Sequence, residues 1–153
     1  LWGTVLIPIF FILTLNTPFG WAKPVPVNFM NLRRPRSQMI WVAIAGPVAN
    51  LFLALFFAAL FHVGTFPPES AVGTFLVLGS FLNLVLAVFN TIPLPPLDGS
   101  RIVMGLLPVA FLHYYRRLES FGFPIILLLW ATNLLSQVLL PVVSILAKLL
   151  GLF

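Results

Sequence analysis

The sequence predicts an all-α membrane protein, and three features of its composition carry the prediction. Hydrophobic residues make up 61% of the 153 residues, charged residues make up only 7%, and the mean hydropathy is +1.12. Soluble domains carry about 25% charged residues, so lipid rather than water is the expected solvent for most of this chain. A chain of this length has room for about four transmembrane segments of 20 residues. We therefore expect a single membrane-embedded domain over residues 1–153.

Four apolar segments are the candidate membrane spans. Residues 3–15 are short for a span, and we expect them to be the end of a helix whose beginning is truncated. Residues 38–61 and 71–92 carry no charge and are long enough to cross a bilayer. Residues 121–147 contain two prolines, which predict a bent or interrupted helix, because proline lacks the amide hydrogen and clashes with the preceding turn.

A short extended or β segment is expected after the first span. Prolines and valines alternate in the stretch at 18–28, which favours polyproline II or an edge strand over a helix. Trp21 and Lys23 are residue types typical of the membrane interface. An exposed extended segment can pair with a peptide by strand addition, although a stiff interfacial loop explains the same residues.

The distribution of charge predicts how the chain crosses the membrane. Most basic residues lie in the stretches at 16–37 and 93–120, whereas the stretch at 62–70 carries only Glu69. Because cytoplasmic loops are enriched in Lys and Arg, we expect loops 16–37 and 93–120 in the cytoplasm, and the loop at 62–70 and the C-terminus outside. The net charge of +5 therefore indicates contact with the lipid bilayer and not nucleic-acid binding. The absence of cysteine excludes disulfide and thiolate chemistry.

Two stripes of small and amide residues predict how the middle spans pack. In each span these residues recur about every four positions, which places them on one helix face. Small residues let helix backbones approach closely in lipid, and asparagine can hydrogen-bond across such a contact. For the asparagines, a packing role and a functional role both stay open. The stripes are Gly46, Asn50, Ala54 and Ala58 in the second span, and Gly79, Asn83, Ala87 and Asn90 in the third.

The third span is expected to be broken at its end, next to an ionisable residue. Three prolines within residues 93–96 cannot continue a helix, so the helix should open near Thr91. Asp98 then lies in non-helical backbone at membrane depth, which is tolerated only inside protein or beside a wet cavity. An ionisable residue in such a place is a functional candidate. The alternatives are an N-cap for a short helix starting near Gly99 and an ion pair with Arg101.

Three motifs, in this order, resemble those of the site-2 protease family. They are FGWAKPVPVN at 19–28, AGPVAN at 45–50, and Asn90 followed by PPLDG at 95–99. The resemblance covers nearly the whole chain after residue 15. It implies a membrane-embedded zinc endopeptidase that hydrolyses membrane-anchored protein substrates, with this chain as the C-terminal part of a larger peptidase-like domain. It also implies a multi-pass protein of the cell membrane, and the compact form suggests a prokaryotic inner membrane.

The resemblance implies roles for particular residues. Asp98 matches the third zinc ligand, and Asn90 matches a residue that binds or polarises the scissile carbonyl. Three protein ligands and one open position are usual for catalytic zinc, which lowers the pKa of a bound water to about 7. Packing roles fall to Gly46, Pro47, Asn50 and Gly99. The candidates for substrate docking are Lys23, Pro24, Val25, Pro26, Val27 and Asn28.

The H-E-x-x-H motif, which in this family supplies two histidine ligands and the general base, does not occur in the sequence. We expect it upstream of Leu1, so that Zn²⁺ would be bound jointly with Asp98 and the present residues would be inactive alone. His62 and His113 fit interfacial histidines better than ligands. Without an upstream motif, the chain would be a non-catalytic membrane scaffold or binding protein of the same fold. A broken helix with an aspartate also occurs in transporters, so a small transporter is a further alternative.

Overall fold

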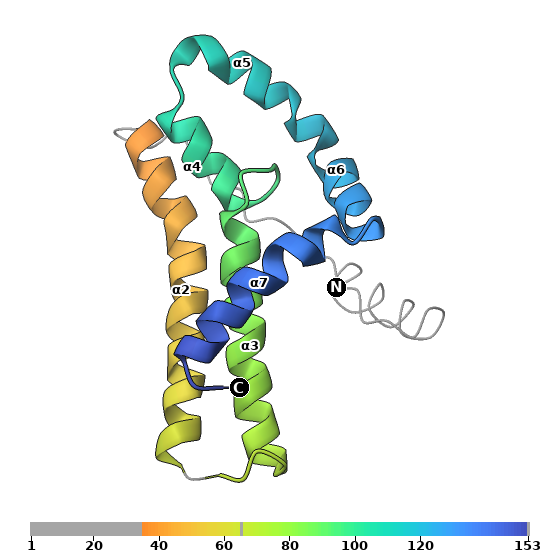
Figure 1. Cartoon of the computed structure of the whole chain (residues 1–153). Helices are drawn as coiled ribbons and strands as arrows, with labels where there is room; N and C mark the ends of the chain where they lie inside the picture. The colour runs from red at the N-terminus through yellow and green to blue at the C-terminus, as the bar shows by residue number, and fades with distance from the viewer. Residues whose placement is uncertain (1–34, 65, 153) are drawn as a thin grey trace, which may run out of the picture. The chain divides into compact units, whose positions relative to one another are not determined.

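The computed structural model describes residues 35–64 and 66–152, and within these ranges the regular elements are α-helices (Figure 1). The all-α prediction is confirmed there. The expected first span at 3–15 and extended segment at 18–28 lie outside the described residues, so four spans and a β segment stay predictions. In chain order the helices are α2 (Pro35–Val63), α3 (Ala71–Thr91), α4 (Asp98–Leu106), α5 (Val109–Arg117), α6 (Glu119–Ala131) and α7 (Leu134–Leu149).

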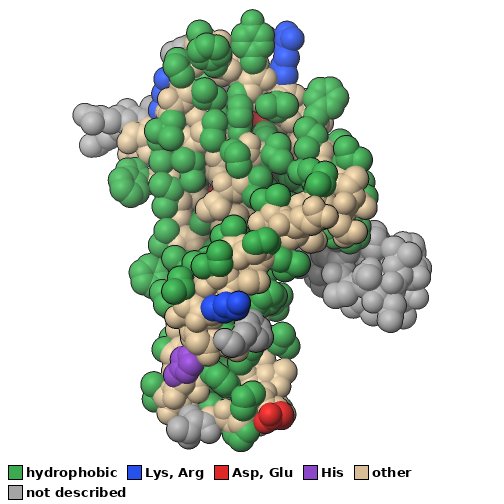
Figure 2. Space-filling model, viewed as in Figure 1, with side chains coloured by type: hydrophobic (Ala, Val, Ile, Leu, Met, Phe, Trp, Pro, Cys, Tyr) green, Lys and Arg blue, Asp and Glu red, His purple; other side chains and the backbone are tan. Residues whose placement is uncertain are grey.

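Two of the described helices, α2 and α3, are long and apolar enough to cross a membrane, and α6 with α7 would make a third if that pair forms one span. α2 and α3 run side by side in opposite directions (Figure 1). They expose large hydrophobic side chains such as Trp41, Phe52 and Phe75, and Figure 2 shows hydrophobic side chains over most of the visible face. Water is a poor solvent for so much exposed apolar surface, so lipid is the solvent that these helices fit.

The interface between α2 and α3 is built on small residues, as the two stripes predict. Ala54 of α2 and Ala87 of α3 are buried. A hydrogen bond crosses the interface from Ser80, whose buried Oγ donates to the carbonyl oxygen of Ala54 at 2.8 Å. Asn83 Nδ2 donates instead to the carbonyl oxygen of Gly79 in its own helix, at 2.8 Å. The cross-helix role that was expected of an asparagine therefore falls to a serine, whose short hydroxyl reaches a backbone that small residues have brought close.

α7 packs against this helix pair and completes the described core. Val143 and Ala147 of α7 are fully buried in one cluster with Leu84 of α3. At the end of α7, the carbonyl oxygen of Leu150 lies 2.7 Å from Nε2 of His62, near the end of α2. The end of α7 and the loop between α2 and α3 therefore lie at the same end of the helix pair. The side of the membrane that they face stays a prediction.

The last apolar segment is interrupted, but not at its prolines. α6 and α7 are bent by 78° relative to each other, while Pro124 lies inside α6 and Pro141 lies inside α7. The break falls at Thr132 and Asn133, and Asn133 has a left-handed φ of 58°. A left-handed residue cannot continue a right-handed helix, and asparagine tolerates this conformation better than most residues. The predicted interruption is thus correct, but its predicted cause was wrong.

Candidate active site

The candidate site lies where α3 ends. Thr91 is the last residue of α3, and residues 92–97 form turns and bends before α4 begins. Pro95, in the middle of this stretch, is fully buried. The prolines break the third apolar helix at the predicted residue, because they supply no amide hydrogen to a continuing helix. The broken end is partly enclosed by protein, since Pro95 and Leu97 are buried whereas Pro93 and Pro96 are exposed.

Asp98 is the first residue of α4, so the prediction that it lies in non-helical backbone is wrong, and Asp98 is not the cap of that helix either. Leu97 takes the N-cap position, and no side chain makes a capping hydrogen bond there. The alternative that Asp98 serves as the N-cap of a short helix is therefore wrong. In the first turn, its carboxylate lies near the positive end of the helix dipole, which favours the charged form that a metal ligand needs.

Two motif glycines determine the surroundings of Asp98. A methyl group added at Gly99 would overlap the backbone carbonyl oxygens of Thr91 and Ile92, so α4 starts in direct contact with the end of α3. A methyl carbon added at Gly46 of α2 would lie 2.7 Å from Oδ2 of Asp98. The carboxyl group of Asp98 is thus held at a junction of α2, α3 and α4, to which the second and third motifs both contribute.

The electrostatic environment of Asp98 has two opposing parts. The side chain is half-buried, and this burial raises the pKa of the Asp98 carboxyl above its ordinary value of 3.8. The positive charge of Arg101, three residues further along α4, lowers the same pKa and offsets part of the rise. The alternative role of Asp98 as an electrostatic partner of Arg101 therefore has support. A bound cation would favour the charged carboxylate further, by the same attraction.

The other predicted site residues on the described helices gather at the same junction or beside it. Asn90 is half-buried in the last turn of α3, directly before Thr91, whose carbonyl oxygen contacts the start of α4. Asn90 and Asp98 therefore lie near the ends of two helices that contact each other, because residues 92–97 form a loop between those ends. On α2, Pro47 is buried and Asn50 is half-buried, and the packing roles expected of them stay predictions.

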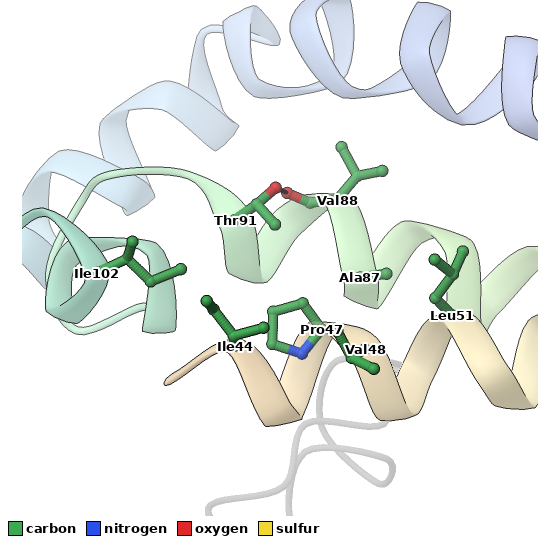
Figure 3. Close-up of a pocket in the computed structure, with 8 residues that line it drawn as sticks. All are labelled: Ile44, Pro47, Val48, Leu51, Ala87, Val88, Thr91 and Ile102. Atoms are coloured by element: carbon green, nitrogen blue, oxygen red, sulfur yellow. Dashed lines mark hydrogen bonds between the residues drawn. The ribbon is translucent and has the colours of Figure 1, made fainter. Parts of the chain in front are cut away.

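An apolar pocket of about 260 Å³ lies beside the junction, between α2, α3 and α4 (Figure 3). Pro47 and Ile102 are among its lining residues; Pro47 follows Gly46 directly, and Ile102 lies one helical turn after Asp98. The hydroxyl of Thr91, another lining residue, donates to the carbonyl oxygen of Val88 in its own helix at 2.6 Å, so this hydroxyl adds little polarity to the pocket. Sequence analysis missed this pocket, because its walls are common apolar residues from three separate segments.

The remaining candidates lie outside the junction. His62 contacts the end of α7, and His113 is exposed on α5, where its ring stacks edge-on with that of Tyr114. Across residues 35–64 and 66–152, no group of three His, Cys, Asp or Glu side chains is placed to hold a metal ion. Zinc accepts carboxylate oxygens as ligands, so the half-buried carboxylate of Asp98, beside non-helical backbone, could serve as one ligand. The described residues do not supply a complete set of further ligands beside it. The expected docking residues 23–28 lie outside the described residues.

Comparison with known proteins agrees with the motifs. The sequence model of peptidase family M50 matches residues 68–131, which include α3, the proline-rich turn and α4. The chain is 42% identical, over 140 residues and 87% of its length, to the protein named "Putative zinc metalloprotease YwhC" of Bacillus subtilis. It is 39% identical over 62 residues (40% of its length) to the similarly named MJ0611 of Methanocaldococcus jannaschii, and 41% identical over 70 residues (45%) to sll0528 of Synechocystis. No solved structure matches the chain.

These matches confirm the resemblance to the site-2 protease family, peptidase family M50, that the three motifs carry. The apolar helices and the family that the chain resembles indicate a membrane protein. The matched part spans 64% of the length of YwhC, 31% of MJ0611 and 18% of sll0528. The chain thus covers less than two thirds of each of these relatives.

Proposed function

We propose that this chain forms one part of the active site of an intramembrane zinc endopeptidase, which hydrolyses peptide bonds of membrane-anchored proteins. The observation that carries the proposal is the placement of the Asp98 carboxyl group against Gly46, at a junction of three helices. An ionisable side chain in such surroundings is costly, and a functional task is the usual reason for it. The family match and the names of the relatives support zinc as the metal.

Asp98 would be one zinc ligand, and Asn90 would act on the substrate. When bound, the metal would polarise the scissile carbonyl and lower the pKa of a water molecule. The start of α4 would hold the Asp98 carboxylate in one place, because Gly99 leaves no gap between α4 and the end of α3. The side-chain amide of Asn90 would donate a hydrogen bond to the scissile carbonyl oxygen, where negative charge develops during attack.

The other parts of the site would come from residues that the structure does not describe. An H-E-x-x-H motif upstream of Leu1 would supply the two histidine ligands and the general base. The stretch at 23–28 would hold the substrate in an extended form by strand addition, because a helical substrate must unwind before its peptide bonds can be reached. The protein would cross the cell membrane several times, with loops 16–37 and 93–120, and therefore Asp98, near the cytoplasmic face.

The test compares two carboxylate-to-amide variants of the full-length protein in detergent. Asp98→Asn removes the charge at the candidate site, and Glu119→Gln makes the same change at an exposed position that begins α6. We expect Asp98→Asn to lose zinc and to cleave a membrane-anchored reporter substrate at least about 100-fold more slowly, since even the loss of a residue that only orients a ligand costs up to that factor. Glu119→Gln should behave as the wild type.

Two results would count against the proposal in different ways. Undiminished zinc content and cleavage in Asp98→Asn would remove Asp98 from the metal site. A wild-type protein that takes up no zinc and cleaves no reporter would favour the non-catalytic membrane binding protein of the same fold.

A further inference from the structure

Gly46 differs from the other glycines of the described helices in which atoms occupy the space that a side chain would fill. A Cβ atom built at Gly46 has two described atoms of other segments within 4 Å, and both belong to the carboxyl group of Asp98: Oδ2 at 2.7 Å and Cγ at 3.7 Å. At Gly99 and Gly122 the built Cβ meets backbone, and at Gly79 it meets an aromatic ring. Those three glycines allow chain segments to pack, whereas Gly46 makes room for a charged group.

Helix packing alone does not require glycine at position 46. Gly46 lies well inside α2, where glycine is a poorer helix former than alanine because it loses more conformational freedom. The later members of the same stripe, Ala54 and Ala58, are buried alanines, so the close approach of α3 to α2 is achieved with a methyl group present. A methyl group at position 46 would be compatible with such packing, but it would collide with Asp98.

The collision could not be relieved by moving the backbone of Asp98. The next residue, Gly99, is in direct contact with the carbonyl oxygens of Thr91 and Ile92, which belong to the backbone and cannot turn aside. A side chain at position 46 would therefore rotate the carboxyl group of Asp98 away from its present place. Metal sites tolerate little displacement of a ligand, because the distances between metal and ligand atoms stay within about 0.2 Å of their preferred values.

We infer that Gly46 is a positioning residue, which sets the place and direction of the Asp98 carboxylate for metal binding by having no side chain. The part of this role that concerns zinc rests on the proposed function. The contact between Gly46 and Asp98 does not, and it can be tested in the metal-free protein.

The first measurement is a double-mutant cycle on thermal stability, with the full-length protein in detergent and a chelator present. Gly46→Ala alone should lower the melting temperature, because the new methyl group displaces the carboxyl group and a Cβ before Pro47 strains the helix. In an Asp98→Ala background, the same substitution should lower the melting temperature less, because the contact with the carboxyl group is gone and only the strain of a Cβ before Pro47 remains. Gly79→Ala is the matched control, and its effect should be the same in both backgrounds.

The second measurement is zinc affinity, determined by competition with a chromogenic chelator. Gly46→Ala should bind zinc at least about tenfold more weakly than the wild type, the lower range for the loss of a residue that orients a ligand. Gly79→Ala should bind zinc as the wild type does. Because Gly46 precedes Pro47, Gly79→Ala does not reproduce the backbone cost of a Cβ at position 46, and the double-mutant cycle separates that cost from the contact with Asp98.

Each outcome decides a separate question. If Asp98→Ala loses zinc but Gly46→Ala has the same effect on stability in both backgrounds, the positioning role is overturned and the proposed function stands. If Asp98→Ala keeps its zinc, the proposed function fails and the positioning of a ligand fails with it, even where the cycle shows coupling. If Gly46→Ala does not fold but the double variant does, the coupling is supported; if neither folds, Gly46 is required for another reason and the inference is overturned.

Discussion

Over residues 35–64 and 66–152 the chain interrupts an apolar helix in two places, and the two breaks are built differently. After Thr91 it turns through a proline-rich stretch, in which Pro95 is fully buried, and continues at the half-buried Asp98. Between α6 and α7 it turns at Thr132 and Asn133, which are both exposed. The first break is in contact with neighbouring helices, whereas the second is stabilised by its own residues.

The two breaks differ in which groups make hydrogen bonds with the backbone there. At the second break the hydroxyl of Thr132 donates to the carbonyl oxygen of Leu128 at 2.8 Å, and the left-handed Asn133 redirects the chain. At the first break a distant residue contributes, because the hydroxyl of Tyr115 on α5 donates to the carbonyl oxygen of Pro93 at 2.7 Å. Backbone groups freed at membrane depth must meet protein or water. A break enclosed by neighbours can hold an ionisable residue in place, whereas a locally satisfied break only turns the chain.

Of the substitutions that test this comparison, Gly99→Ala should lower the free energy of unfolding the most, because it separates α4 from the end of α3 at the first break. The added methyl group would overlap the backbone carbonyl oxygens of Thr91 and Ile92. We expect the free energy of unfolding to fall by about 3 kcal/mol, the upper end for overpacking, and cleavage activity to fall with it. Unfolding in mixed micelles measures the change, with Gly79→Ala as the control, since its methyl group meets the ring of Phe57 at 3.3 Å. An equal loss in both variants would contradict the special position of Gly99.

Gly122→Ala tests whether α6 encloses the first break. The added methyl group would overlap the carbonyl oxygen of Pro95, but α6 can shift outward because Phe121 and Phe123 on either side are exposed. We expect a smaller loss of about 2 kcal/mol in the free energy of unfolding, together with faster amide hydrogen exchange in residues 92–97. Unchanged exchange in that stretch would mean that α6 is not part of the enclosure.

Asn133→Ala addresses the second break. Alanine adopts the left-handed conformation less readily than asparagine, so the free energy of unfolding should fall by about 1 kcal/mol. Zinc content and cleavage should stay at the wild-type level, because this break holds no ionisable residue. Asn133→Gly should be close to the wild type in stability, since glycine reaches a positive φ without strain. A loss of cleavage as large as that of Asp98→Asn would show that the second break also belongs to the active site.

Tyr115→Phe should have the smallest effect. It removes the hydrogen bond from α5 to Pro93 while keeping the aromatic ring, and the residue is only partly buried. We expect a loss of about 0.5 kcal/mol in the free energy of unfolding, the low end for one hydrogen bond. Thermal melting beside the wild type measures this. A loss comparable to that of Gly99→Ala would mean that α5 contributes more to the enclosure than its single bond indicates.

The first break was predictable from the sequence, but the cause of the second was not. Several prolines close together, as in residues 93–96, exclude a helix whatever surrounds them, because each lacks an amide hydrogen. The single prolines Pro124 and Pro141 are weaker signals, and a helix can continue past one proline when its neighbours satisfy the freed carbonyl group. Asn133, whose φ is left-handed, gave no clear signal, because asparagine occurs in turns, caps and helix interiors alike.

The sequence by itself determined that this is a helical membrane protein that resembles the site-2 protease family, with an ionisable residue, Asp98, next to a broken helix. These conclusions depend on the preferred solvent of the side chains, on local backbone chemistry and on the order of motifs, all of which are properties of the linear chain. Only the tertiary structure decided that the carboxyl group of Asp98 occupies the space left by Gly46, and that Ser80 makes a bond across the α2–α3 interface. Those contacts join atoms from segments far apart in the chain, and their distances follow from how the helices pack rather than from any local pattern.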